Sequence, residues 1–576
     1  MRRHVVLSQW FLLLVLLFTH LTLAAQPGTL RERLDPEALA YLRIPSPWGL
    51  LTEAKGSSLS PALESTANQA AAQLIRDALA ARLGELTDPT VSLLGRWLAT
   101  LRSPLELAVV SSPSGPNLLA QARFGFASAG DFQAELERLL ATAPDLQLSA
   151  QWVADGTATV ATPGGPMHLH FDPASGGLRL RAGPGATLDG IDAPATAATG
   201  EHPMASFEVA IDQSGQGLFL WLNGPALMPL VNTQLGDAER AQLATFGLNP
   251  PGQAALGYGV SDGHGKLSIV VDLPDAGLLS MVPRVRTDLT LESVGEPGVV
   301  LMMSLPLPEL LRQGEALLAA EGGEDFNEFQ EFRRELETTL GMPLDQALAS
   351  IGPEFVVFTD AVGEFLALRV NDAEHLNRLL EALVANTEVR YDTLAMGDHS
   401  LHRLVIPGEE EPLEEWSPAT YLYWVQDADY LILGQLPQPL RDRLNTDTRL
   451  ALGDWLRDTQ GQTPDEAMLL VSTRLERIPR RAYYGYLQLL QMLADLSGAE
   501  LDLLAFPSAS ELNLPEAGSY GLQMDFGQRL GLTFTFQNNP LEILMQPGIG
   551  GVMAAGVMAA VAIPAYMGFM EGAELD

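Results

Sequence analysis

The chain has 576 residues, which is more than one ordinary hydrophobic core organises, so two or more domains are expected. Its 71 acidic and 34 basic residues give a net charge of −37, which argues against nucleic acid as a partner and against attachment to anionic lipid through charge. The chain has no cysteine, which excludes disulfides, thiolate metal sites and a lipidated cysteine anchor.

The first 25 residues have the order of a secretory signal peptide. Two arginines precede an apolar run from Trp10 to Leu23, and the small residues Ala24 and Ala25 follow. A charged segment, an apolar segment and a small-residue cleavage site are the three parts of such a signal. We therefore predict that the protein is exported, with residues 1–25 as its signal peptide. An uncleaved anchor is the alternative, because the residue three positions before the cleavage site is not small.

The same order of elements occurs twice in the body of the chain. The clearest pair is "DFQAELERLLAT" (131–142) and "NDAEHLNRLLEAL" (371–383), which share a Leu-x-Arg-Leu-Leu pattern. Leucines at this spacing predict two helices, and Asp131 and Asn371 stand where an N-cap belongs. Four further pairs keep the same order, namely 39–51 with 299–311, 98–111 with 348–359, 218–231 with 467–480, and 254–273 with 518–536.

These correspondences predict an α+β protein with two tandem related domains, residues 36–280 and 290–540. Strand-like runs that occur in hairpins favour antiparallel sheets with helices packed on them. Stretches without periodicity are expected to be loops, at 183–203, 272–298 and the acidic 408–416. The order of elements loosely resembles a family of exported bacterial proteins known as a domain of unknown function. That resemblance implies no catalytic residue.

The stretch "HLHFD" offers one candidate metal site. His168, His170 and Asp172 alternate along a strand and therefore share one of its faces. The stretch resembles the start of the H-x-H-x-D-H motif of metallo-β-lactamase-like hydrolases, but Pro173 replaces the final histidine. The corresponding strand of the second repeat keeps His402 without a second ligand on that face. A solvated polar strand face is the alternative interpretation, and it is the one that we favour.

The stretch "GVSDG" (259–263), followed by His264, fits the G-x-S-x-G pattern of a serine nucleophile. A nucleophile elbow needs a helix after the serine, whereas "KLSIVVDL" has the pattern of a strand. We therefore predict that Ser261 lies at the tip of a hairpin. No phosphate-binding loop, dinucleotide fingerprint or H-E-x-x-H motif occurs, so no cofactor is expected. The sequence shows no enzymatic activity, and a protein that is not an enzyme is the favoured interpretation, with an enzyme as the alternative.

The C-terminal region contains 23 uncharged residues, from Gly548 to Met570. As a helix this segment would be about 34 Å long, enough to cross a bilayer core. We predict a transmembrane helix over 546–570, a single-pass anchor that holds the protein at the periplasmic face of the bacterial inner membrane. Gly551, Ala555 and Ala559 recur at a spacing that lets helices approach closely, so self-association or a protein partner is expected there.

Part of this segment, "GVMAAVAIPAYMGF", resembles the hydrophobic helix of type IV pilins. The matching positions are Ala559, Ala560, Ala562, Ile563, Pro564, Ala565 and Tyr566. No prepilin processing site precedes them, so the resemblance implies pilin-like helix packing rather than pilus assembly. If the protein proves soluble without detergent, the segment is instead expected to be a helix packed against the second domain.

Taken together, these features favour an exported, membrane-anchored envelope protein with a binding or scaffolding role. One alternative is a metal-dependent envelope hydrolase that uses His168, His170 and Asp172. The other is a periplasmic carrier of a small molecule or lipid, with its site between the two domains.

Overall fold

The computed structural model describes residues 29–537 except for 53–58, 85–92, 94–95, 98, 143–147, 190–201, 234, 276, 278–279, 281–282, 322, 387–388, 397–398 and 408–418. The predicted signal peptide 1–25 and the predicted transmembrane helix 546–570 lie outside the described residues. So do the acidic loop 408–416 and most of the predicted loop 183–203.

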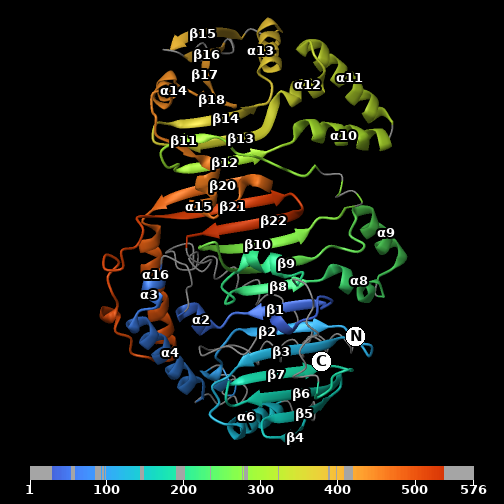
Figure 1. The fold of residues 1–576 in the computed structure, drawn as a ribbon, viewed down its shortest axis with the longest axis vertical. Helices are drawn as coiled ribbons and strands as arrows, with labels where there is room; N and C mark the ends of the chain where they lie inside the picture. Colours follow the sequence, from blue (N-terminus) through green and yellow to red (C-terminus); the bar gives the residue numbers. More distant parts are fainter. Residues whose placement is uncertain are drawn as a thin grey trace, which may run out of the picture.

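Within the described residues, twenty strands form one continuous antiparallel sheet, and helices pack on it, so the protein is a mixed α+β structure (Figure 1). The first half of the sheet contains β1 (Ala40–Ile44), β2 (Leu105–Val110), β3 (Asn117–Arg123), β4 (Ala150–Ala154), β5 (Thr157–Thr162), β6 (Gly165–Asp172), β7 (Gly177–Ala182), β8 (Leu218–Leu222), β9 (Ala254–Ser261) and β10 (His264–Asp272). The second half contains β12 (Val299–Ser304), β13 (Ile351–Thr359), β14 (Glu364–Val370), β15 (Arg390–Met396), β16 (His399–Ile406), β17 (Thr420–Asp427), β18 (Tyr430–Gly434), β20 (Ala467–Glu476), β21 (Ala517–Phe526) and β22 (Arg529–Phe536).

The two halves of the sheet have the same strand order. From one edge inward, the first half runs β4-β5-β6-β7-β3-β2-β1-β8-β9-β10. From the other edge inward, the second half runs β15-β16-β17-β18-β14-β13-β12-β20-β21-β22. The halves meet where β10 pairs with β22, with Ser268 opposite Thr533. The antiparallel arrangement predicted from hairpins is confirmed, whereas the domain bounds 36–280 and 290–540 stay a prediction.

The helices fall into corresponding groups. The first half contributes α2 (Pro47–Thr52), α3 (Ser60–Leu63), α4 (Thr66–Gly84), α6 (Ala129–Ala141), α7 (Ala205–Ile211), α8 (Gly224–Asn232) and α9 (Asp237–Phe246). The second contributes α10 (Leu307–Glu321), α11 (Glu324–Leu340), α12 (Leu344–Ala349), α13 (Ala373–Asn386), α14 (Pro437–Leu444), α15 (Leu452–Gln460) and α16 (Ile478–Ser497). A separate two-stranded sheet pairs β11 (Glu292–Val294) with β19 (Arg449–Ala451).

The two helices predicted from the repeated leucine pattern are present, but their predicted caps are wrong. Helix α6 begins earlier, because the Ser128 hydroxyl accepts a hydrogen bond from the Asp131 amide at 3.1 Å. Helix α13 begins later, because the Asp372 carboxylate accepts from the amides of Glu374 and His375 at 3.0 and 3.1 Å. In both helices, the residue just before the first helical residue supplies a side-chain oxygen, which accepts hydrogen bonds from the free amides of the first turn.

Helix α16 belongs to the second half in sequence but packs on the first half of the sheet, beside α4 (Figure 1). Its residues Tyr483, Tyr486 and Leu490 are buried in the largest hydrophobic core, together with side chains from α2, α3, α4 and α6. The Tyr486 hydroxyl donates to the Leu51 carbonyl at 3.0 Å. The core of the first half therefore includes a helix from the second.

The other face of the sheet carries separate cores in each half. In the first half, α7 packs over β8 and β9 and buries Phe207 and Ile211 against Trp221. In the second half, α14 and α15 bury Leu440 and Trp455 against the strands. Helices therefore cover part of this face in each half.

Candidate binding face

One register row crosses most of the sheet and is apolar throughout. Residues directly opposite one another on paired strands share a face, so the pairing places the whole row on one side of the sheet. From β4 to β18 the row consists of Trp152, Ala158, Leu169, Leu180, Ala120, Leu107, Leu42, Leu220, Leu256, Ile269, Leu532, Met524, Leu469, Met303, Phe355, Leu368 and Leu431. We call this side the row face and the other side the opposite face.

Burial decreases along the row from the first half toward the join. From Ala158 to Leu107 every member is buried, beneath the helices of the first half. Beyond β1 the cover ends, and Leu256, Ile269 and Met303 are 38%, 48% and 38% exposed. We call the row-face side chains of β8, β9, β10, β22, β21, β20, β12 and β13 the open face.

Further apolar side chains of the open face flank the apolar row. Val357, Leu301 and Phe534 belong to the adjacent row, in which Val357 pairs with Leu301 across β13 and β12. They are also exposed by more than a third of their surface. Contiguous exposed apolar surface of this extent marks an interaction site in most soluble proteins.

Polarity is inverted where the two halves meet. Along β10, Lys266 and Ser268 on the opposite face are buried, whereas Ile269 on the row face is half exposed. The buried polar groups are satisfied, since Lys266 Nζ lies 3.1 Å from Asp262 Oδ2 and the Ser268 and Thr533 hydroxyls lie 3.0 Å apart. An antiparallel sheet that faced water on its row face would carry polar residues there. Here the row face is therefore the more apolar and more exposed of the two faces.

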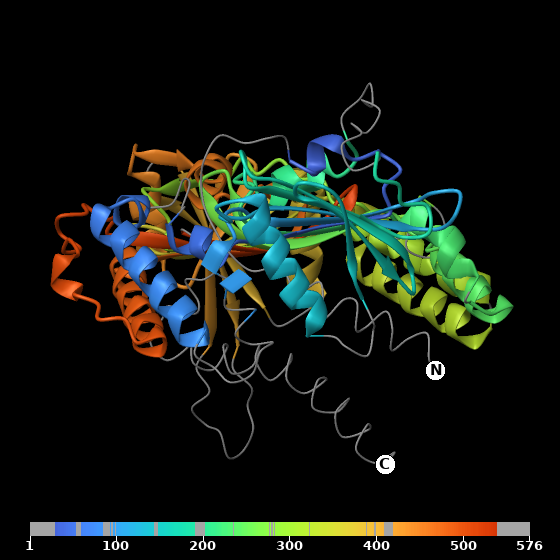
Figure 2. The same ribbon diagram turned by 90° about the horizontal axis from the view of Figure 1, so that it is seen from below.

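Helix α9 of the first half and helices α10, α11 and α13 of the second half leave this surface uncovered. Among the residues that the structure describes, none is buried in α9, α10, α11 or α13. Figure 2 shows α4 and α16 on the left and α10 and α11 on the right, all on the same side of the sheet. The open face therefore lies on the side of the sheet that carries these helices.

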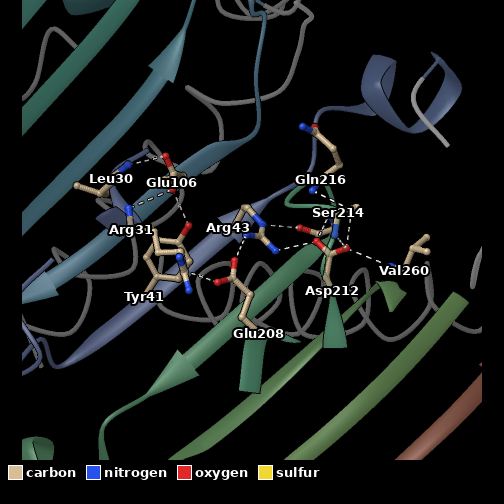
Figure 3. A network of polar contacts seen from close by, with 11 residues as sticks. Leu30, Arg31, Tyr41, Arg43, Glu106, Glu208, Asp212, Ser214, Gln216 and Val260 are labelled. Carbon is tan, nitrogen blue, oxygen red and sulfur yellow. Dashed lines mark hydrogen bonds and ion pairs between the residues drawn. The ribbon is translucent and has the colours of Figure 1, made fainter. Parts of the chain in front are cut away.

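A buried ionic network on the opposite face joins β1 to α7 (Figure 3). The Arg43 guanidinium pairs with Glu208 and with Asp212, the latter at 2.7 Å. The Tyr41 hydroxyl donates to the Glu106 carboxylate at 2.7 Å. Burial, with the nearby Glu106 charge, raises the pKa of Tyr41.

Backbone groups complete this network. Asp212 accepts hydrogen bonds from the amides of Gly217 and Val260 at 2.8 and 3.1 Å, and Glu106 accepts from the Leu30 amide at 2.8 Å. Each of these carboxylates is therefore engaged by a donor. The network ties together segments that are distant in sequence, which is a structural role. A buried charge cluster assembled from such distant segments has no local sequence signal.

The candidate metal residues do not form a site. Among the described residues, no group of three or more His, Asp or Glu side chains is placed to hold a metal ion. His168 and His170 each lie 2.9 Å from the hydroxyl of a threonine on the adjacent β5, Thr159 and Thr157. Asp172 turns toward its own loop and accepts from the Ser175 hydroxyl at 2.6 Å. This strand face is hydrogen-bonded within the sheet.

The serine of "GVSDG" lies at the end of β9, as predicted, and β10 follows directly. Asp262 and Gly263 form the two-residue turn, with φ of 53° and 77°, the positive values that tight hairpin turns require. The Ser261 hydroxyl donates to the Val209 carbonyl at 2.8 Å. His264 instead lies 3.0 Å from the Thr459 carbonyl of α15, so the two side chains form no nucleophile–base pair.

His402 has an aromatic rather than a metal-binding setting. Its ring belongs to a cluster with those of Tyr391 and Trp424, in which the three centroid distances are 5.4 to 5.9 Å, and the Tyr391 hydroxyl is 2.6 Å from Nδ1. Burial lowers the pKa of His402, which favours its neutral form.

The open face was not predicted, although the sequence contains a signal for it. Strands such as "VVLMMS" at 299–304 are apolar on both faces, which indicates cover on both sides. The alternation of residues along a strand does not identify which helix packs on each of its two faces. The cover of the first half comes partly from α16, some 370 residues beyond β2 in the chain, so local patterns gave no access to it.

Among the described residues, no helix combines the length and apolarity needed to cross a bilayer. No family model matches the chain. No curated protein matches it. Two solved structures are similar, crystal forms III and I of TP0453, each 11% identical over 42% of this chain. They are covered over 78% and 81% of their own length, with TM-scores of 0.23 and 0.24. The likeness is distant, and nothing about function is carried over from it.

Proposed function

We propose that the protein is an exported envelope protein with a binding or scaffolding role, which accepts an apolar α-helix on its open face. The observation that supports this most strongly is the inversion at the join of the two halves, where Ser268 is buried and Ile269 is half exposed. Leaving a wide apolar surface in water is unfavourable by about 25 cal/mol per Å². A partner that covers the open face removes that penalty.

An α-helix is the occupant that the first half suggests. There, the same apolar row is covered by helices, and α6 places Phe132 and Leu136 against it. On the open face, strands of both halves offer a floor of the same aliphatic character without such a cover. A helix with one apolar side would pack on this floor as α6 packs on its own.

The place of action belongs to this proposal. The apparent signal peptide 1–25 supports export, and the uncharged segment 546–570 supports a single-pass anchor at the periplasmic face of the inner membrane. The two halves are proposed to be related domains, 36–280 and 290–540, that share one sheet. Their common strand order supports this proposal.

A full-length variant with Val557→Glu and Val561→Glu, here called the tail-charged protein, allows the open face to be tested without detergent. We expect it to bind the neutral apolar dye Nile red. Adding Leu532→Glu should weaken the binding about tenfold or more, because a carboxylate in an apolar contact costs more than 1.4 kcal/mol. The matched control is Leu504→Glu, since Leu504 is 95% exposed and lies outside the open face. Equal binding by all three proteins would contradict the proposal.

Competition then identifies the class of occupant. A leucine-rich helical peptide with lysine ends should displace Nile red from the tail-charged protein. The same peptide should not weaken the Nile red binding that remains when Leu532→Glu is added. If oleate displaces the dye and the helical peptide does not, the carrier alternative replaces the scaffolding role.

A further inference from the structure

The last described strand, β22, lies in the middle of the open face. Strand β22 lies between β10 and β21, and its residues Leu530, Leu532 and Phe534 are all more than a third exposed. The strand ends at Phe536, whose ring packs edge-on against Tyr520 with centroids 5.9 Å apart. The following residues therefore leave the described structure beside this surface.

We propose that the chain's own segment 548–570 is the helix that docks on the open face. This inference rests on the proposed function, because it names the helix that the open face accepts. The dimensions agree: the eight strands from β8 to β13 span about 34 Å at ~4.8 Å per strand, and a helix of 23 residues is also about 34 Å long. Residues 538–547, which link β22 to the segment, reach about 34 Å when extended.

The chemistry of the two surfaces agrees as well. Segment 548–570 has no charged residue, and the apolar row has no polar one, so docking buries no unpaired charge. Gly551, Ala555 and Ala559 form a stripe of small side chains that allows a helix to lie close to a flat surface. In a chain of net charge −37, this match between two uncharged surfaces is specific.

Docking and membrane insertion use the same apolar side chains of the segment and therefore exclude each other. With the segment in the bilayer, the open face is free for a partner helix. With the segment on the open face, that surface is closed and the protein has no anchor. Competition between these two states would regulate partner binding.

Disulfide trapping tests the docked state in the full-length protein, which has no native cysteine. Leu532→Cys is combined in turn with a cysteine at each of the four positions 555–558, which together sample all sides of a helix. Isolated envelopes and the soluble fraction are then oxidised. We expect an intramolecular bond from at least one position, about tenfold more abundant than with Leu504→Cys as the partner.

The pair Ile269→Cys and Leu532→Cys, which lie opposite each other on β10 and β22, shows that oxidation reaches the open face. If that pair forms its disulfide and no bond to positions 555–558 appears, the docking inference is wrong. Dimers linked between two chains would also overturn it, because a second copy would then supply the helix. Neither result affects the Nile red assay, so failure of the docking inference is distinguishable from failure of the proposed function.

Discussion

The two halves of the sheet share a strand order but differ in how their row faces are covered. In the first half, α6 and α16 press on the apolar row and bury Leu169, Leu180 and Leu107. In the second half, no described residue of α10, α11 or α13 is itself buried, and Met303 and Val357 are exposed. On the opposite face, both halves carry a helix-covered core. The comparison teaches that one strand arrangement can carry either a finished core or a surface for a partner, depending on where its helices lie.

The largest expected effect tests the likeness of the two halves on the opposite face. Arg43 and Arg443 are both buried and paired, Arg443 with Asp360 and Asp427 at 3.3 and 3.0 Å. Arg43→Met and Arg443→Met should each lower the free energy of unfolding by about 4 kcal/mol, because each leaves buried carboxylates without a partner. Urea unfolding measures this. If only one of the two variants lost stability, the opposite faces of the two halves would not be equivalent.

The next prediction concerns the difference between the row faces. Leu136 of α6 and Leu376 of α13 occupy the same place in the repeated leucine pattern, but Leu136 is 2% exposed and Leu376 is only half-buried. Leu136→Ala should destabilise the protein by about 3 kcal/mol, and Leu376→Ala by about 1 kcal/mol or less. Thermal or urea unfolding of the two variants provides the comparison. Equal losses would mean that α13 is packed as tightly as α6.

A third prediction examines the polar side of the join between the halves. Burial raises the pKa of Asp525 to about 6, and the Glu466 charge acts in the same direction against Lys266 and a hydrogen bond from Gln523. Since this pKa exceeds that of an aspartate in the unfolded chain, about 4, the contribution of Asp525 to stability is full below pH 4 and is lost as the pH rises through 6. Above pH 7, Asp525→Asn should therefore be more stable than the wild type by about 2 kcal/mol.

The measurement is the difference in free energy of unfolding between Asp525→Asn and the wild type at several pH values. This difference should grow in favour of the variant between pH 4 and pH 7. A difference that stays constant over this range would show that Asp525 is not held in a buried setting at the join.

The smallest expected effect lies on the open face itself. Met303→Ser removes an apolar side chain that is 38% exposed, so the free energy of unfolding should change by about 0.5 kcal/mol or less. The same substitution in the tail-charged protein should weaken Nile red binding measurably, because it removes part of the apolar floor. Met302→Ser, on the opposite face and fully buried, is the matched control and should destabilise the fold instead.

Local patterns predicted much of the fold. The leucine spacing located α6 and α13, and the alternation around Ser261 identified a hairpin and correctly argued against a nucleophile elbow. Both features depend on neighbours within one or two turns of the chain. The continuity of the sheet depends on the pairing of β10 with β22, strands some 260 residues apart, which no local pattern encodes.

The candidate site was predicted less well for the same reason. His168 and His170 share a strand face, as their alternation requires, but threonines on β5 engage them, and strand alternation does not show what an adjacent strand contributes. The open face depends on which helices cover which half. That arrangement follows from the crossing of α16 onto the first half, a long-range packing choice.

The most direct test of the central claim compares two positions in the same apolar row. Leu107→Cys lies under the helices of the first half, and Met303→Cys lies on the open face; each is introduced singly into the tail-charged protein, which otherwise lacks cysteine. The rate of maleimide labelling in the folded state measures the cover over each thiol. We predict that the thiol at 303 reacts at close to the rate of an unfolded control while the thiol at 107 is protected at least about a hundredfold, as expected for a core position. Equal protection at both positions would contradict the claim that the second half leaves its row face open.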